Sequence, residues 1–188
     1  MKIVVVGTRG IPDIQGGVET HCEELYPRLA AMGHDVTVVR RSCYVTPQNK
    51  IKEYKGVHLK DIYAPRRKSI EAIVHTFLAI IYARWVGADV LHIHAIGPAL
   101  LTPLARLLGL RVVMTHHGPD YDRQKWNKTA KSVLRWGERM GTNYANEVIV
   151  ISTVIDNILR EKYDRTDAHL IYNGVNKPCL LYTSPSPR

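Results

Sequence analysis

Four short polar segments of the sequence hold residue types that could do chemistry, and each follows a run of branched apolar residues. The densest segment, residues 115–126, contains His116, His117, Asp120 and Arg123. A neutral imidazole donates and accepts hydrogen bonds, a carboxylate accepts them from hydroxyl groups, and a guanidinium pairs with phosphate. This segment predicts a site that binds hydroxyl groups or phosphate, with an ordinary solvated loop as the alternative.

A second segment, residues 7–20, holds Gly16 and Gly17 at the expected start of a helix. Without β-carbons, these glycines let a ligand approach backbone N–H groups, and the positive end of the helix favours phosphate. A flexible turn is the alternative. The segment does not fit the G-x-G-x-x-G pattern of dinucleotide sites, because Arg9 stands where the second glycine belongs. This departure argues against a standard NAD site.

A third segment holds His92 and His94. Residues two apart in a strand share one face, so both imidazoles are expected on the same side of the sheet, where one can simply pack against a helix. His94 is nearer the carboxyl end of the strand and is the better ligand candidate. Metal ligation is not expected, because no Cys or carboxylate accompanies the pair at ligand spacing.

The fourth segment holds Arg40 and Arg41. Arginines at this place in a dinucleotide-binding fold hold the 2′-phosphate of NADP, although solvated surface charge is the more common role. An NADP-dependent oxidoreductase is therefore the alternative enzyme class, and saturable NADPH binding would distinguish it.

Alternating strands and helices must position these segments. Expected strands are residues 2–7, 35–41, 57–64, 89–94, 111–115, 147–152 and 168–172, and expected helices are 17–32, 70–86, 97–108, 126–144 and 153–163. This order predicts an α/β fold, a doubly wound parallel sheet of the Rossmann-like kind, with helices on both faces. Ligands bind beyond the carboxyl ends of the strands in such sheets, which is where the polar segments lie.

Two helices carry finer expectations. In the first, Val18, Cys22, Leu25, Leu29 and Met32 follow helical spacing and predict one buried apolar stripe. In the helix at 97–108, Pro103 should either kink the helix or mark its true start.

Composition limits the class of protein. The 188 residues are 45% hydrophobic and 23% charged, which fits one globular unit and excludes a disordered or fibrous chain. The net charge of +9 favours anionic partners, with a merely basic enzyme as the alternative. Three scattered cysteines fit a reducing compartment. The apolar stretch at 70–86 contains Glu71, His75 and Arg84, so it predicts a core helix instead of a membrane span.

Together, five segments resemble the N-terminal half of GT-B-fold glycosyltransferases of family 4, the glycogen-synthase-like retaining group. The resemblance covers roughly residues 1–176 and is carried by residues 1–12, 16–20, 115–120, 145–152 and 171–175. It implies two Rossmann-like domains facing across a cleft, with the acceptor held mostly by the N-terminal one. It also implies a nucleotide-sugar co-substrate and no metal or other cofactor.

The resemblance implies roles for the residues that match the family motifs. Gly16 and Gly17 would lie beside the donor phosphates and the transferred sugar, in a motif that ends at Thr20. Arg9 and Thr20 are expected to bind substrate nearby.

His117 would reach the sugar near the reacting centre, and Asp120 would contact a hydroxyl or the acceptor. Whether His116 or His117 is the site histidine stays open. The expected substrate-binding set is completed by His94, His116, Arg123 and Asn173, and Asn173 would also lead into the second domain.

The end of the chain differs from the rest. Residues 177–188 have neither helical nor strand periodicity and end in Pro-Ser-Pro-Arg. We expect them to lie outside the native fold, either as a disordered tail or as foreign sequence at the end of a truncated gene, which sequencing the source gene past codon 176 would test. The paired Glu residues of the family's donor-binding domain have no counterpart here. We therefore expect that domain to be absent and the chain alone to be inactive.

These observations predict a glycosyltransferase, or a fragment of one, in polysaccharide or glycoconjugate biosynthesis. It would transfer a sugar from a nucleotide-sugar donor to a saccharide or lipid-linked acceptor. A cytoplasmic location is expected, and the basic turn at residues 65–68 suits peripheral contact with an anionic membrane, with a solvated loop as the alternative. A stand-alone sugar-phosphate-binding module is a further alternative. Nucleic acid is not expected, because basic and aromatic residues are not interleaved.

Overall fold

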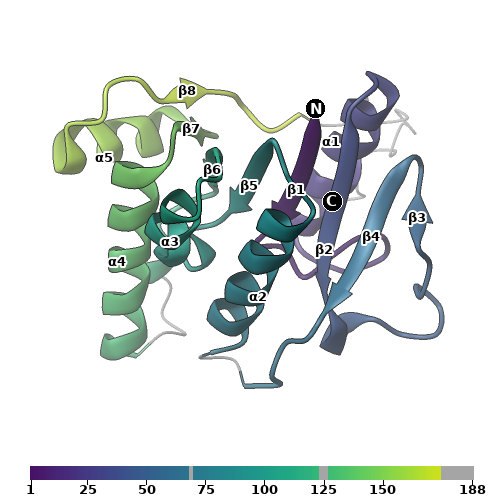
Figure 1. Cartoon of the computed structure of the whole chain (residues 1–188). Coiled ribbons are helices and arrows are strands. Elements are labelled where there is room, and N and C mark those ends of the chain that lie inside the picture. The colour runs from purple at the N-terminus through teal and green to yellow at the C-terminus, as the bar shows by residue number, and fades with distance from the viewer. Residues whose placement is uncertain (68–69, 123–126, 175–188) are drawn as a thin grey trace, which may run out of the picture.

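A single eight-stranded sheet runs through the centre of the protein (Figure 1). The computed structural model describes residues 1–67, 70–122 and 127–174, so the expected tail at 177–188 lies outside the described residues. The strand order is β3-β4-β2-β1-β5-β6-β7-β8. The strands are β1 (Lys2–Val6), β2 (Asp35–Arg41), β3 (Glu53–Tyr54), β4 (Val57–Ile62), β5 (Val90–His94), β6 (Val112–His116), β7 (Glu147–Val150) and β8 (His169–Leu170).

Every neighbouring pair in this sheet is parallel except β3 with β4. The α-helices are α1 (Gly17–Ala31), α2 (Glu71–Trp85), α3 (Thr102–Leu107), α4 (Lys128–Tyr144) and α5 (Thr153–Tyr163). In Figure 1, α1 lies behind the sheet, and α2 and α3 lie in front of it. The doubly wound fold that the sequence predicts is confirmed.

Alternation along β1 explains why the sheet is covered on both faces. Ile3 and Val5 pack into the apolar cluster beneath α1, whereas Val4 and Val6 pack into the larger cluster beneath α2 and α3. A strand buried on both faces needs apolar residues at successive positions, which the Ile-Val-Val-Val run supplies. The central strand β5 differs: Leu91 and Ile93 pack into the larger cluster, whereas the buried His92 and His94 alternate with them.

Some expectations at the ends of elements are wrong. Met32 is 72% exposed because α1 ends at Ala31 and Met32 caps it, and the fully buried Tyr26 packs against the sheet. The short strand β3, which forms a hairpin with β4, was not predicted. The helix expected at 97–108 is divided into a 3-10 turn, Pro98–Leu101, and α3, where Pro103 occupies the first turn. The expectation that Pro103 marks the true start of the helix is therefore confirmed. A proline is tolerated there because the first-turn N–H groups have no helical partner.

The helix α2 is a core helix on one side only. Ala79, Ile80 and Ala83 are fully buried, whereas Phe77 and Trp85 are 45% and 80% exposed. Among the described residues, no helix is both long enough and apolar enough to cross a membrane.

Arg40 and Arg41 are neither solvated surface charges nor free to bind a 2′-phosphate, so both sequence interpretations are wrong. The fully buried Arg40 donates from Nε to Asp61 Oδ1 at 2.6 Å and from Nη1 to the Asn49 carbonyl at 2.7 Å. Arg41 donates from Nη1 to Glu71 Oε1 at 2.7 Å. Both guanidinium groups are held by partners distant in the sequence.

We expect Arg40→Met to destabilise the protein by about 3 kcal/mol, because it leaves buried carbonyl oxygens and Asp61 without their donor. Urea unfolding measures this change. Arg67→Met, at an exposed position, is the matched control and should leave the free energy of unfolding almost unchanged. Equal stability of the two variants would contradict the structural role of Arg40.

Candidate functional site

The polar segments meet where the order in which the chain adds strands to the sheet reverses. The chain passes from β1 to β2 on one side, whereas β5 pairs with β1 on the other side and with β6 beyond it. The loops after β1, β5 and β6 therefore share one edge of the sheet. At this edge Gly7 has a φ of +96°, and a β-carbon there would lie 2.1 Å from the His94 carbonyl oxygen. Only glycine allows the loop after β1 to lie this close to the end of β5.

The loop after β1 leads into α1, whose N-terminus has no side-chain cap. The Glu19 carboxylate in the first turn instead accepts hydrogen bonds from the Thr8 hydroxyl at 3.2 Å and the Arg9 backbone N–H at 2.9 Å. A β-carbon at Gly16 would lie 1.9 Å from Glu19 Oε2, whereas one at Gly17 would meet no atom of the described chain within 4 Å. Gly16 is thus explained by packing, and Gly17 borders open space.

His117 lies beside this helix. A hydrogen bond joins Nε2 of the half-buried ring and His94 Nδ1, 2.8 Å apart, and the two rings are stacked with centroids 5.2 Å apart. His21, from the second turn of α1, packs edge-on against His117 with centroids 5.3 Å apart. The structure therefore brings the start of α1 and the ends of β5 and β6 together around His117.

His21 was not predicted as a site residue. It follows Gly17 by four residues, which places both on one side of α1. That spacing is the signal that could have identified it. A hydrogen bond joins its side chain to that of Asn173, which is exposed just after β8. Asn173 thus lies at the expected site although it is far away in the sequence.

The other expected site residues belong to the loops and the helix that lead to this centre. Arg9 is exposed, donates to the Gln15 carbonyl at 3.0 Å and lies over the Tyr44 ring. Thr20 is exposed in the first turn of α1. Asp120 is half-buried at the start of a 3-10 turn, Asp120–Asp122, three residues after His117. Arg123 lies outside the described residues.

His116 and His117 have different environments. His116 is fully buried, its Nδ1 accepts from the Gly118 backbone N–H at 3.1 Å, and its Nε2 lies 2.8 Å from Glu138 Oε1. Because Nδ1 accepts, the ring proton is on Nε2 and is donated to Glu138. Both nitrogens of His116 are therefore engaged within the protein. The same is true of His94, which contacts Tyr26 through Nε2 and His117 through Nδ1.

Glu138 of α4 holds the loop that carries His117 and Asp120. Besides His116, it accepts from the hydroxyls of Tyr121 at 3.2 Å and Tyr163 at 2.7 Å. Burial raises the pKa of Glu138, but these hydrogen bonds outweigh it, and its pKa is lowered overall. Glu138 therefore stays a carboxylate and anchors the loop after β6.

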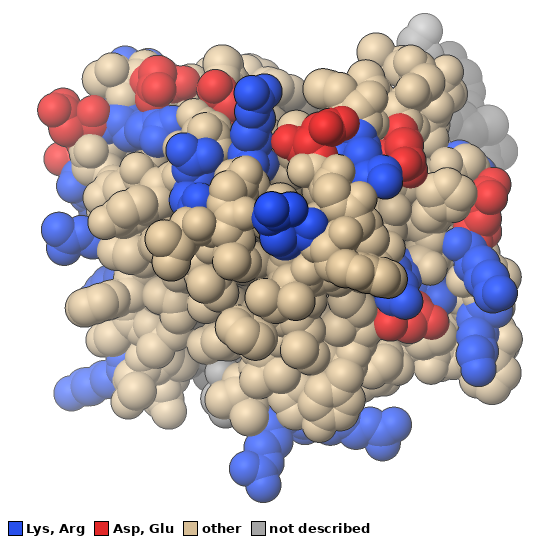
Figure 2. All heavy atoms as spheres, in the orientation of Figure 1, with Lys and Arg blue, Asp and Glu red and all other residues tan. Residues whose placement is uncertain are grey.

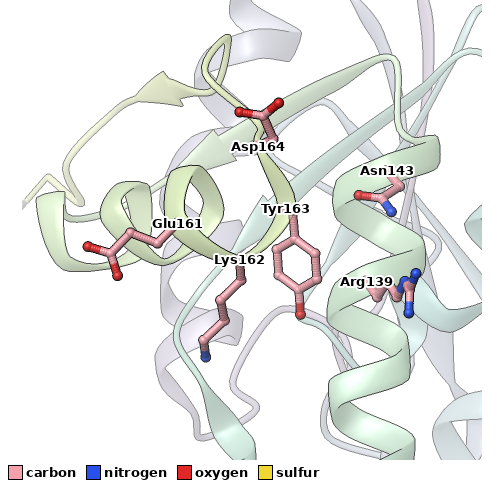
Figure 3. A pocket seen from close by; sticks show the side chains of 6 residues that line it. All are labelled: Arg139, Asn143, Glu161, Lys162, Tyr163 and Asp164. Atoms are coloured by element: carbon pink, nitrogen blue, oxygen red, sulfur yellow. The ribbon is translucent and has the colours of Figure 1, made fainter.

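Figure 3 shows Tyr163 extending from the end of α5 toward α4. It lines a polar groove of about 440 Å³ between the two helices, together with Arg139, Asn143, Glu161, Lys162 and Asp164. None of the site residues expected from the sequence lines this groove. The candidate site is therefore the edge around His117 and the start of α1.

Burial keeps the imidazoles of this site neutral. Burial, together with the nearby His21 and His116, lowers the pKa of His117 to about 4. Burial likewise lowers the pKa of His21. Near neutral pH the site presents uncharged rings that donate and accept hydrogen bonds.

A Rossmann-like sheet with its site at this edge is the architecture of the N-terminal half of GT-B glycosyltransferases. The particular family follows from the sequence: the model of Glycosyltransferase Family 4 matches residues 15–177, and the chain belongs to that family. A comparison with curated proteins finds no match.

Solved structures share the fold. Sucrose-phosphate synthase from Thermosynechococcus elongatus is 20% identical, with a TM-score of 0.74, over 93% of this chain and 48% of that one. HepE from Anabaena, in complex with UDP and glucose, is 13% identical with a TM-score of 0.65, over 93% and 45% of the two chains. UGT2 from Phytolacca americana is 11% identical with a TM-score of 0.57, over 93% and 53%. The chain thus spans about half the length of each.

Buried histidines should make stability depend on pH. Burial lowers the pKa of His75 to about 4, from 6.5 in an exposed histidine. The unfolded chain therefore binds more protons between these values, and stability falls as pH drops from 7 to 5. We expect His75→Leu to remove about 2 kcal/mol of that loss. Urea unfolding at both pH values measures it.

The control for this measurement is His58→Leu, because the His58 side chain is 60% exposed. This variant should lose as much stability between pH 7 and pH 5 as the unchanged chain. If His75→Leu also lost the same amount of stability, the pKa of His75 would not be lowered in the folded protein.

Proposed function

We propose that this chain is the acceptor-side domain of a retaining glycosyltransferase. The reaction moves a hexose or deoxyhexose from a nucleotide sugar to a hydroxyl of a saccharide or lipid-linked acceptor, in polysaccharide or glycoconjugate assembly. The observation that carries the proposal is His117, half-buried beside the uncapped start of α1 in a chain of glycosyltransferase family 4.

The geometry supports a division of roles. Backbone N–H groups at the start of α1 are not capped by a side chain, so they suit a phosphate, and Gly17 leaves room for its approach. Such N–H groups stabilise the charge that develops on a departing nucleotide. The neutral His117 orients a hydroxyl of the transferred sugar, and Asp120 accepts a hydrogen bond from a sugar or acceptor hydroxyl.

Two of the expected substrate-binding histidines act indirectly in this proposal. His94 is fully buried and holds His117, and His116 is fully buried and holds the loop through Glu138. We therefore assign His117 as the site histidine. The exposed Arg9, Thr20 and Asn173 remain proposed substrate contacts.

A nucleotide sugar is the proposed donor, and two of the solved neighbours support it. HepE was solved with UDP and glucose, and UGT89C1 from Arabidopsis thaliana, with a TM-score of 0.54, was solved with UDP. We propose no metal cofactor, in line with the family resemblance. Chelation with EDTA should therefore leave donor binding unchanged.

Turnover needs more than this domain. A retaining transfer holds the donor phosphates while the leaving group departs, and the start of α1 faces them from one side only. Because the chain spans about half the length of its solved neighbours, we propose that a second domain supplies the other side. The 188-residue chain should bind donor weakly and transfer no sugar.

Saturation-transfer NMR of the purified chain with a panel of UDP-, ADP- and GDP-sugars tests the proposal. We expect saturation of the sugar protons of at least one donor, and its loss in His117→Ala. His58→Ala, at an exposed position on β4 outside the proposed site, is the matched control and should bind as before. A His117→Ala variant that binds as well as the unchanged chain would overturn the assignment, and sugar transfer by the chain alone would contradict the need for a second domain.

We also propose that the protein makes peripheral contact with the cytoplasmic face of an anionic membrane. Arg66 and Arg67 are exposed in the turn before α2, and Phe77, Ile81 and Trp85 are exposed along that helix. In Figure 2, Lys and Arg project from the lower edge of the molecule, where α2 begins, and most acidic residues of that face lie higher. Basic residues near exposed apolar ones suit an interface with anionic lipid.

Sedimentation with liposomes measures this contact. The chain should pellet with anionic vesicles more than with neutral ones, and added salt should weaken the difference. Replacing Arg66 and Arg67 with Gln should reduce pelleting severalfold, because each basic residue contributes about 1 kcal/mol near such a surface. Equal pelleting with both kinds of vesicle would contradict an electrostatic contact.

A further inference from the structure

A chain of hydrogen bonds runs from the core of the protein to His117. Thr115 Oγ1 lies 2.7 Å from His92 Nε2, and His92 Nδ1 lies 2.9 Å from the Tyr26 hydroxyl. The same hydroxyl contacts His94 Nε2, and His94 Nδ1 lies 2.8 Å from His117 Nε2. Thr115, Tyr26, His92 and His94 are all buried. Three elements, α1, β5 and β6, therefore contribute to one continuous chain.

All members of the chain are uncharged near neutral pH. Burial lowers the pKa of His92 to about 3 and that of His117 to about 4, and it lowers the pKa of His94 well below the usual value. Burial also raises the pKa of the Tyr26 hydroxyl, so it keeps its proton. Each imidazole thus has one N–H and one lone pair.

Proton counting leaves two arrangements. The Tyr26 oxygen can accept two hydrogen bonds, but among the described residues the hydroxyl has no hydrogen-bond partner besides His92 and His94. Its one proton is therefore satisfied only if it donates to one of these histidines and accepts from the other. If it donates to His94, then His92, His94 and His117 all carry their proton on Nδ1. If it donates to His92, all three carry it on Nε2. Any mixed arrangement puts two protons, or none, into one of the buried links, or leaves the buried Tyr26 proton without an acceptor among the described residues.

We propose that Tyr26, His92 and His94 are positioning residues that fix the ring and the tautomer of His117, so that the three histidines change tautomer only together. The Tyr26 hydroxyl is the point at which the direction of the chain is set. Its single proton couples the buried His92 to His117 at the exposed end of the hydrogen-bond chain.

The hydrogen-bond chain ends at His117 Nδ1, its exposed end. Within the described part of the protein, no hydrogen bond reaches this nitrogen, and the ring is half-buried. A ligand hydroxyl that donates to Nδ1 selects the arrangement with protons on Nε2, and one that accepts from Nδ1 selects the other. This use by a sugar hydroxyl rests on the proposed function, whereas the coupling of the tautomers does not.

Two-bond ¹H–¹⁵N correlation spectra of the histidine rings test the coupling in the 188-residue chain at pH 7 without any ligand. We expect His92, His94 and His117 to show the same ratio of the two tautomers. Opposite tautomers at His92 and His117, or a charged ring at either, would overturn the proposal. The spectrum of the unchanged chain needs no substitution, and it requires no sugar binding, so its outcome is separate from that of the proposed function.

Tyr26→Phe removes the hydroxyl and keeps the ring. In this variant the tautomer ratios of His92 and His117 should separate by about fivefold, the effect of one hydrogen bond of ordinary strength. Tyr54→Phe also removes a half-buried tyrosine hydroxyl, one that donates to Glu23 of α1 and forms none of the hydrogen bonds of this chain, and should leave both ratios unchanged. An unchanged His117 ratio in Tyr26→Phe would overturn the role of Tyr26.

Discussion

The contact of the Tyr26 hydroxyl with His92 and His94 fastens α1 to the central strand β5, and the arrangement of the site depends on it. Two imidazoles buried in the face of a sheet need polar partners, because a buried polar group without one is costly. Tyr26 is a partner for both. With α1 fixed at this point, its second turn brings His21 against His117, and its first turn presents Gly17 at the edge of the sheet.

Two of the loops around this edge are anchored by buried charges in addition to apolar packing. Arg40 holds the segment that follows β2 through the carbonyls of Asn49 and Ile51, and Glu138 holds the loop that follows β6. Charged hydrogen bonds are directional and lose much energy when broken, so they fix a loop more closely than apolar contact does. His117 thus extends from a loop whose backbone is held in place by these hydrogen bonds.

Much of the fold could be predicted from the sequence because the strands are short runs of branched apolar residues and the helices have clear starts and ends. The two-residue strand β3 and the exposed Met32 were missed because each depends on a neighbour or on the last turn of a helix. Arg40 was misread for a related reason: its partners lie 9 to 29 residues away. The local sequence also could not show whether His116 or His117 is the site histidine. Glu138, from a later helix, distinguishes them because it holds His116 inside the protein.

Gly16 and Gly17 are neighbours with different constraints. Gly16 is confined by Glu19, whereas Gly17 has open space on its side-chain face. A change of residue size at position 17 therefore alters the space at the start of α1 without disturbing the packing of the domain. In the proposed function, substitutions at such a position would change the size of the group that fits there, while the scaffold that holds the histidines is preserved.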